Sequence, residues 1–370
     1  MTGRDEWEPI PMTSGPLNAE TPLPAMTNPL TPTRSFYIRN HFDIPSIDAH
    51  TWRLDLDGAV EHPGRFALSE LQRLPKRDLW VTLECAGNGR GAMKPLPPGL
   101  PWGFGAVGTA RFTGVPLSLV LERAAPRSDA REVLFVGADR GRVESGEVVP
   151  FARSLPIEIA RHPDTLVALA MNGRPLSPEH GFPARLIVPR WYAMASVKWL
   201  VGIQVLVAHF EGFFQKDDYV YTDDAGRSPS EPVSLMRVRS VIGTPADGAE
   251  VSLGSVEIAG TAWSGHPPVV LVEVSADGGS SWHRAKLGPA PSPYAARPWR
   301  CLLRLDSPGS YSVVSRATDQ AGYTQPTDPF WNARGYGNNV THRIRLNVTI
   351  TRGSEGDEVR IIRPGSRLPA

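Results

Sequence analysis

Cysteine is scarce in this chain of 370 residues, which holds only Cys85 and Cys301. Two thiols cannot build the disulfide framework of a small secreted scaffold. They also cannot complete a zinc or iron–sulfur site that is made of cysteines alone. Glycine and proline, by contrast, are plentiful at 35 and 37 residues, which favours many turns and short strands over long helices.

An excess of charge of one sign is also absent, because 39 Lys and Arg face 38 Asp and Glu for a net charge of +1. This balance gives no overall field for nucleic acid or anionic lipid, and we expect neither as a partner.

Long hydrophobic runs are missing too. The longest apolar stretch, residues 199–210, is interrupted by Gln204 and His209 and is too short to span a bilayer. Residues 1–12 (MTGRDEWEPIPM) have neither the apolar region of a signal peptide nor paired arginines. The sequence as given predicts a soluble cytoplasmic protein without a membrane partner, or a periplasmic one if a leader was removed before residue 1.

The length favours two or three domains, and three changes of pattern divide the chain. Residues 1–35 carry seven prolines and few aliphatic side chains, which is typical of an extended arm. Residues 36–236 mix strand and helix patterns. Residues 237–352 contain short alternating strands separated by turn signals, a pattern typical of an immunoglobulin-like β-sandwich. Residues 353–370 form a charged tail.

Periodicity and turn residues predict the elements of the mixed region. Helices are expected over residues 67–74, after Pro116, and over 151–161. Strands are expected over residues 52–58, 79–84, 133–136, 186–188 and 197–207, with a hairpin over 166–176 that turns at Asn172-Gly173.

Cys85 follows the strand over residues 79–84 and opens the segment CAGNGRGA. Three glycines there expose backbone N–H groups and allow close approach by a ligand. The loop amides and Arg90 would favour a thiolate. A small buried thiol at a strand end explains the same pattern, so both interpretations stay open. Cys301, which alternates with Trp299 and Leu303, is expected to be structural.

A single thiolate limits the possible chemistry. A thiol hydrolase would need a nearby histidine base, and sequence does not give that distance. A metal centre with one protein thiolate would take its other ligands from a cofactor. Molybdenum bound to a pyranopterin dithiolene fits, because the organic cofactor brings two sulfurs and the protein adds one.

Six short motifs occur in one order along the mixed region. They are YIRNHF at 37–42, TLECAGNGR at 82–90, LPWG at 100–103, GTAR at 108–111, HGFPAR at 180–185 and SVKW at 196–199. Together they resemble the sulfite oxidase family of molybdenum enzymes. The later sandwich resembles that family's dimerisation domain, including FWNARG at 330–335. The resemblance implies an α+β chain: a mixed α/β molybdopterin-binding domain followed by an immunoglobulin-like β-sandwich.

The resemblance also implies roles for particular residues. Cys85 would be the thiolate ligand of molybdenum. The other cofactor contacts would be Tyr37, Arg39, Asn40, His41, Asp139, His180, Arg185, Ser196, Val197 and Lys198. The catalytic and substrate-binding residues would be Cys85, Tyr219, Arg39, Arg90, Trp102 and Arg334. In physical terms, arginine and lysine pair well with a cofactor phosphate or a small oxyanion such as sulfite. Taken alone, each histidine is better explained as a polar core residue, and the alternative explanation for Arg185 and Lys198 is a surface charge.

The implied reaction is oxygen-atom transfer that oxidises sulfite to sulfate, with the protein supplying binding and charge compensation. The resemblance implies a homodimer. We expect no haem, because His62-Pro63-Gly64 reads as a turn, so electrons would pass to an external acceptor such as a cytochrome.

Two differences from the motifs of the sulfite oxidase family leave the identity of the substrate open. Gly89 stands where many relatives carry a second arginine, and residues 190–195 lack the basic, glycine-rich form of the animal enzymes. The same cofactor acting in the reducing direction on nitrate or a sulfoxide is therefore a second hypothesis. A non-catalytic binding protein that uses the sandwich is a third.

Overall fold

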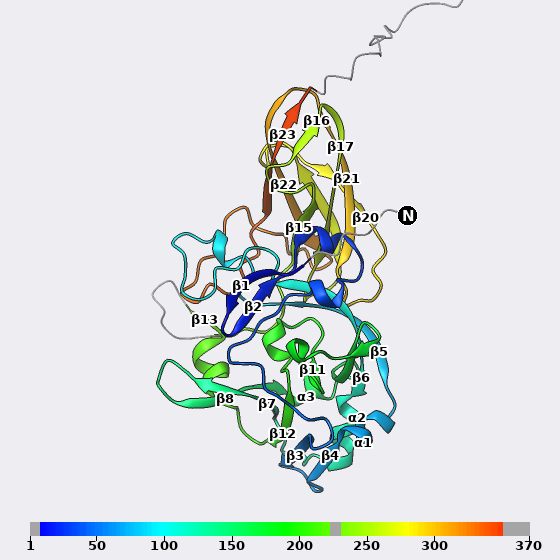
Figure 1. Ribbon diagram of the computed structural model, residues 1–370, viewed down its shortest axis with the longest axis vertical. Helices are drawn as coiled ribbons and strands as arrows, with labels where there is room; N and C mark the ends of the chain where they lie inside the picture. The colour runs from blue at the N-terminus through cyan, green and yellow to red at the C-terminus, as the bar shows by residue number, and fades with distance from the viewer. Residues whose placement is uncertain (1–7, 223–230, 351–370) are drawn as a thin grey trace, which may run out of the picture.

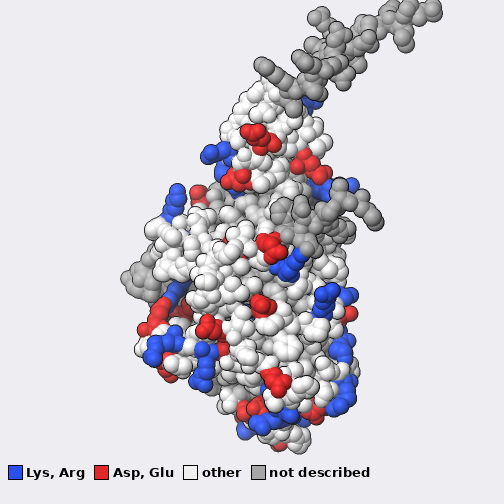
Figure 2. Space-filling model, in the orientation of Figure 1, with Lys and Arg blue, Asp and Glu red and all other residues white. Residues whose placement is uncertain are grey.

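The computed structural model describes residues 8–222 and 231–350. The molecule is elongated, with the mixed domain at one end and the sandwich at the other (Figure 1). The N-terminal hairpin lies near the junction of the two domains. On the face shown in Figure 2, acidic and basic side chains are interspersed, in keeping with the net charge of +1. Within residues 8–222 and 231–350, no helix is long and apolar enough to cross a membrane.

Two five-stranded sheets form the mixed domain. The first runs β10-β9-β6-β5, with β11 also pairing β9. Its strands are β5 (Arg77–Glu84), β6 (Val107–Pro116), β9 (Leu166–Met171), β10 (Arg174–Pro175) and β11 (Arg185–Ile187). The second runs β4-β3-β12-β7-β8. Its strands are β3 (Arg53–Gly58), β4 (Gly64–Ala67), β7 (Glu132–Arg142), β8 (Val148–Pro156) and β12 (Leu200–Leu206).

The helices of this domain are short. The α-helices are α1 (Leu68–Arg73), α2 (Leu117–Ala124) and α3 (Ile157–Ala160). The 3₁₀ turns are η1 (Leu23–Thr27), η2 (Thr33–Ser35), η3 (Arg90–Ala92), η4 (Pro178–His180) and η5 (Ala193–Ala195), and η6 (Phe214–Asp218) is a π-helical turn. Proline marks the start of two α-helices. Pro116 precedes α2 and Pro156 precedes α3, each with backbone angles outside the helical region.

The sandwich packs a four-stranded sheet, ordered β15-β17-β21-β20, on a five-stranded sheet ordered β16-β23-β22-β18-β19. The first holds β15 (Arg239–Thr244), β17 (Gly254–Trp263), β20 (Lys286–Leu287) and β21 (Arg297–Leu305). The second holds β16 (Glu250–Ser252), β18 (Val269–Ser275), β19 (His283–Arg284), β22 (Gly309–Asp319) and β23 (His342–Thr349). A further small pair, β13 (Val220–Tyr221) and β14 (Glu231–Pro232), joins the two domains.

Each domain has its own apolar core, as the alternating strands predict. In the sandwich, Trp299, Cys301 and Leu303 of β21 all point inward, so Cys301 is a buried core thiol. The core of the mixed domain also takes in Val241 and Trp263, which come from β15 and β17. The two domains therefore share apolar contacts along their junction.

Two local expectations are wrong. The helix expected over residues 151–161 is mostly strand β8, whose residues from Phe151 to Leu155 are all buried, and only α3 at its end is helical. A strand that is buried on both faces shows no alternation of apolar and polar residues, so the sequence of residues 151–161 did not indicate a strand. Within the expected N-terminal arm, the described residues 8–35 form a hairpin of β1 (Ile10–Ser14) and β2 (Leu17–Glu20), followed by η1 and η2, and are not extended throughout.

Other expectations are met. The hairpin between β9 and β10 turns at Asn172 and Gly173, which both have positive φ as a primed turn requires. The tail at 353–370 lies outside the described residues.

Candidate active site

Cys85 lies directly beyond the paired end of β5. The register of β5 against β6 ends at Glu84 and Val107, and the Cys85 amide then donates to the carbonyl of Ala106 at 2.8 Å. Gly89 has φ of +81°, the left-handed region that favours glycine. This turn leads into η3 and returns Arg90 toward Cys85.

The Cys85 side chain is only 5% exposed. Burial raises the pKa of its thiol, while Arg39, the Gly87 amide and Arg90 act in the opposite direction. The net shift is upward, so the loop amides and Arg90 do not by themselves favour a thiolate, contrary to the sequence-based expectation. A coordinated metal cation deprotonates a thiol outright, and this environment therefore suits a metal ligand better than a free nucleophile.

A first cavity, of about 660 Å³ including space open to solvent, extends from Cys85 into the mixed domain. It collects most of the side chains that the motifs predicted for the cofactor. These are Tyr37, Arg39, Asn40, His41, Cys85, Asp139, His180, Arg185, Ser196 and Lys198. Val197 is not among its lining residues, because its side chain is buried in the core.

Positive charge is concentrated in the first cavity. Burial first, and Arg185 next, lower the pKa of Lys198 well below its ordinary value. Burial, Lys198 and Arg185 lower the pKa of His180 to about 4. Burial raises the pKa of Asp139 to about 6, so near neutral pH its carboxylate is still largely ionised and offsets one of the cations. An anion bound here would relieve the repulsion among these groups.

Arg185 also lacks one hydrogen-bond acceptor. Its Nη1 donates to the carbonyl of His180 at 3.1 Å and its Nη2 to that of Ser196 at 3.0 Å. Its buried Nε has no partner. No group of three or more His, Cys, Asp or Glu side chains able to hold a metal ion lies within residues 8–222 and 231–350. One thiol beside a cation-rich cavity thus fits a metal delivered by an anionic organic cofactor.

The N-terminal hairpin fixes one wall of the first cavity. Ala19 of β2 exchanges two backbone hydrogen bonds of 2.9 Å with Ile38. The Oδ1 of Asn18 accepts from the Asn40 amide at 2.8 Å, and Asn40 Oδ1 in turn accepts from Nζ of Lys198. The hairpin therefore orients the segment that carries Arg39 and His41, a role that its proline-rich sequence did not reveal.

A second cavity, of about 550 Å³ including space open to solvent, also borders Cys85. Arg39, Cys85 and Tyr219 line both cavities. All six predicted catalytic residues line the second one: Arg39, Cys85, Arg90, Trp102, Tyr219 and Arg334. The sandwich domain contributes Arg334 and Tyr336, so this cavity lies at the domain junction.

The two arginines of the second cavity differ in environment. Arg90 is buried, and its Nε and Nη2 donate to the carbonyl of Arg334 while its Nη1 donates to that of Leu100. Its guanidinium also lies 5.1 Å from the ring centroid of Tyr336. Arg334 is more open, with its side chain 30% exposed, and pairs with Glu144 at 3.1 Å. Arg90 is thus held by buried backbone carbonyls, whereas Arg334 is held by the exposed Glu144 and by the carbonyl of Asp217 at 3.2 Å.

Tyr219 stands between the cavities within an aromatic group. Its hydroxyl lies 3.0 Å from Nε2 of His41, and its ring stacks on Tyr336 with centroids 4.9 Å apart. The Tyr336 hydroxyl donates to Asp218 at 2.8 Å. The buried guanidinium of Arg153 lies 5.7 Å from the centroid of Tyr219. These contacts fix the position of the Tyr219 hydroxyl.

Sequence reasoning missed four residues of this region, namely Glu144, Arg153, Asp218 and Tyr336. Two of them had a signal, because Asp218 precedes Tyr219 and Tyr336 follows the FWNARG motif. Glu144 and Arg153 come from a hairpin loop and a strand that carried no motif.

Comparisons with known proteins identify the family and its two domains. The family model for the oxidoreductase molybdopterin binding domain matches residues 41–214, and that for the Mo-co oxidoreductase dimerisation domain matches residues 230–349. Sulfite oxidase of Arabidopsis thaliana is 34% identical over 364 residues, covering 90% of this chain and 92% of that protein. The chain belongs to the sulfite oxidase family. The resemblance seen in the motifs, the molybdopterin-binding domain and the following immunoglobulin-like domain are thereby confirmed.

Two further relatives place the chain within the family. Mitochondrial sulfite oxidase of Mus musculus is 36% identical over 358 residues, which cover 90% of this chain and 64% of that protein. The chain therefore spans somewhat less than two thirds of the mouse protein. The crystal structure of the sulfane dehydrogenase SoxCD from Paracoccus pantotrophus matches with a TM-score of 0.80 and 27% identity, covering 95% of this chain and 90% of that one.

Proposed function

We propose that this protein is a molybdenum-dependent enzyme that oxidises sulfite to sulfate and passes two electrons to an external acceptor. The observation that carries the proposal is the meeting of two cavities at one buried thiol, Cys85. One cavity is rich in cations and fits an anionic cofactor. The other is lined by three arginines and fits a small oxyanion.

In this proposal each cavity has a defined task. Cys85 ligates molybdenum. The pterin cofactor is held by the predicted residues that line the first cavity: Tyr37, Arg39, Asn40, His41, Asp139, His180, Arg185, Ser196 and Lys198. Arg185 and Lys198 suit its phosphate, because a guanidinium binds as a fork and an ammonium as a point charge. The carboxyl of Asp139 suits its amino groups.

When bound, the molybdenum cofactor supplies the redox chemistry, in which sulfite and water become sulfate, two protons and two electrons. The protein's own residues bind and orient the substrate. Arg39, Arg90 and Arg334 offer donors to the sulfite oxygens, and the indole of Trp102 and the hydroxyl of Tyr219 complete the pocket. Since Arg90 is already fixed by three hydrogen bonds, it needs no reorganisation when the anion arrives.

The dimerisation-domain match supports a homodimer formed through the sandwich. The proposal includes no haem in this chain, and a separate protein such as a cytochrome takes the electrons one at a time.

The test is an assay of the protein produced in a host that makes the molybdenum cofactor. We expect about one molybdenum atom per chain and sulfite-dependent reduction of an artificial one-electron acceptor. Nitrate-dependent or sulfoxide-dependent oxidation of a reduced dye, without sulfite oxidation, would favour the reducing alternative. Oxidation of other reduced sulfur compounds, but not of sulfite, would show that the enzyme has a different sulfur substrate. A folded protein without molybdenum would contradict sulfite oxidation and both alternative molybdenum activities, and would favour a non-catalytic binding role.

A further inference from the structure

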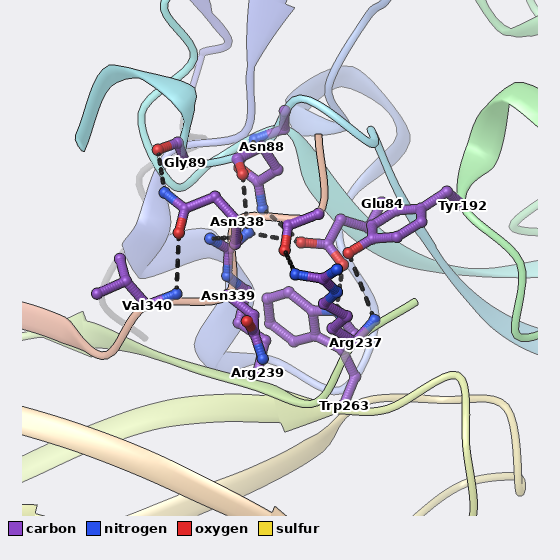
Figure 3. Close-up of polar contacts among 12 residues, drawn as sticks. Glu84, Asn88, Gly89, Tyr192, Arg237, Arg239, Trp263, Asn338, Asn339 and Val340 are labelled. Carbon is purple, nitrogen blue, oxygen red and sulfur yellow. Dashed lines mark hydrogen bonds and ion pairs between the residues drawn. The ribbon is translucent and has the colours of Figure 1, made fainter. Parts of the chain in front are cut away.

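A buried ion pair between Glu84, the residue before Cys85, and Arg239 joins the two domains (Figure 3). Glu84, the last residue of β5, lies 2.6 Å from Nη1 of Arg239, the first residue of β15. Both side chains are only 1% exposed. A buried pair of this kind is strongly destabilising when one partner is lost, because the remaining charge stays dehydrated.

Both partners form hydrogen bonds with the loop that follows Cys85. Glu84 accepts from the indole of Trp263 at 2.8 Å through Oε2 and from Asn88 Nδ2 at 3.0 Å through Oε1. Arg239 also donates to the carbonyl of Asn88 at 3.2 Å and to that of Asn338. The pair therefore holds Asn88 by its side chain and by its backbone.

The sandwich side binds the same loop at further points. Asn338 Nδ2 donates to the carbonyl of Gly89 at 2.6 Å, and the amide of Gly337 donates to the carbonyl of Ala86 at 2.8 Å. Three successive points of the loop, at residues 86, 88 and 89, are thus attached to the second domain. Cys85 and Arg90 lie at the two ends of the stretch that these contacts fix.

The position of Arg239 also accounts for Gly89. A Cβ at position 89 would overlap Nη2 of Arg239, in addition to the strain of a positive φ. The space beside Gly89 is therefore filled from the sandwich, by the Arg239 guanidinium that pairs with Glu84.

We propose that Glu84 and Arg239 are positioning residues, through which the sandwich fixes the distance between the thiol of Cys85 and the guanidinium of Arg90. This inference rests on the proposed function, since it gives the two ends of the loop their tasks of metal ligation and anion binding. The second domain is then a structural part of the active site as well as a dimerisation module.

The test compares Glu84→Gln, Arg239→Lys and the double variant Glu84→Gln/Arg239→Gln in the full chain. Glu84→Gln keeps size and one acceptor, Arg239→Lys keeps the charge but loses the fork, and the double variant leaves no unpaired buried charge. The matched control is Glu273→Gln/Arg316→Gln, which removes a half-buried pair with a separation of 2.8 Å within the sandwich.

The first measurement is hydrogen exchange of the amides of residues 86–91, in protein without and with the cofactor. We expect exchange in Arg239→Lys and in the double variant to rise at least tenfold over the native protein, with no change in the control. The second measurement is the sulfur-to-molybdenum charge-transfer absorption, which should shift in the pair variants alone. The third is steady-state kinetics. In the pair variants, KM for sulfite should rise at least fivefold, and this fold-change should exceed the fold-decrease in kcat.

Loop amides that keep native protection in the folded variants, together with an unchanged spectrum and KM, would overturn the proposal. If Glu84→Gln fails to fold, the double variant decides, because it carries no uncompensated charge. If the native protein binds molybdenum but does not oxidise sulfite, the proposed function fails. The exchange and absorption measurements still test the pair in that case.

Discussion

The phenol oxygen of Tyr219 lies 3.0 Å from Nε2 of His41, at the point where the two cavities meet. Burial, with Arg39 and Lys198, lowers the pKa of His41 well below its ordinary value, so the imidazole is neutral at pH 7. The contact of His41 with Asp218 at 3.8 Å is therefore not an ion pair at this pH. Burial raises the pKa of Tyr219, and its hydroxyl stays protonated, free to donate to His41 or to a substrate oxygen.

Tyr219→Phe tests this arrangement. The variant keeps the ring that stacks on Tyr336 and loses only the hydroxyl, so we expect kcat for sulfite oxidation to fall about 100-fold, as for the loss of one oriented donor at a reacting site. Molybdenum content should not change. Tyr311→Phe, at a tyrosine of the sandwich that bonds Ser307, is the control. A kcat within twofold of the native value would show that the hydroxyl plays no part in the reaction.

Glu144→Gln tests whether an internal carboxylate competes with the anionic substrate. Glu144 pairs with Arg334 at 3.1 Å, and 73% of its side chain is exposed, so the pair contributes only about 0.2 to 1 kcal/mol. Freeing Arg334 should therefore lower KM for sulfite about two- to fivefold, with the larger effect at low salt. Glu158→Gln, at an exposed position of α3, should leave KM unchanged. A raised KM would mean that Glu144 orients Arg334 instead of competing for it.

Lys198→Met tests the charge of the first cavity. Nζ of Lys198 donates to the carbonyl of Glu179 at 2.9 Å and to Asn40, and its charge is repelled by Arg185. Losing this cation should reduce the pterin and molybdenum that copurify with the protein about tenfold, because a charge-assisted bond to an anion is lost. Lys216→Met, at an exposed lysine of η6, is the control. Full cofactor loading of Lys198→Met would remove this residue from the cofactor site.

The sequence predicted the elements that carry a clear local signal. Alternation along Trp299, Cys301 and Leu303 located a sandwich strand, and Asn172-Gly173 located a hairpin turn. The same holds for the site, since the glycine-rich loop after Cys85 and the cations Arg185 and Lys198 stand within short motifs. Their individual roles remain predictions, although the structure brings them to one cavity.

Other features depend on contacts between distant segments and left no local trace. Glu84 and Arg239 are separated by 155 positions, and nothing in either neighbourhood indicates the partner. Strand β8 was taken for a helix because both of its faces are buried. The hairpin of β1 and β2 was missed because seven prolines hid a pairing that depends on contacts with Ile38 and Asn40.

His342 predicts how stability depends on pH. Burial, followed by Arg239, lowers its pKa to about 4, whereas an unfolded chain takes up the proton near pH 6.5. The unfolded state therefore binds more protons between these values, and stability is full above pH 6.5 and falls as the pH drops toward 4. For this one group the loss is about 3 kcal/mol.

The measurement is the unfolding free energy against pH for the native chain and for His342→Asn. The amide oxygen of asparagine can still accept from the Ile242 amide, which donates to Nδ1 at 2.9 Å in the native chain. The variant should lose stability less steeply between pH 6.5 and 4. His283→Asn, at an exposed histidine, should keep the native slope. Equal slopes for His342→Asn and the native chain would contradict the assignment.

The central claim is that the thiolate of Cys85 ligates molybdenum delivered by a pterin dithiolene. X-ray absorption at the molybdenum edge tests it most directly, on the native protein and on Cys85→Ser, each produced where the cofactor is made. The account predicts three sulfur neighbours at molybdenum in the native protein and two in Cys85→Ser, with cofactor retained in both. The same sulfur count in both proteins, or a native protein without molybdenum, would contradict it.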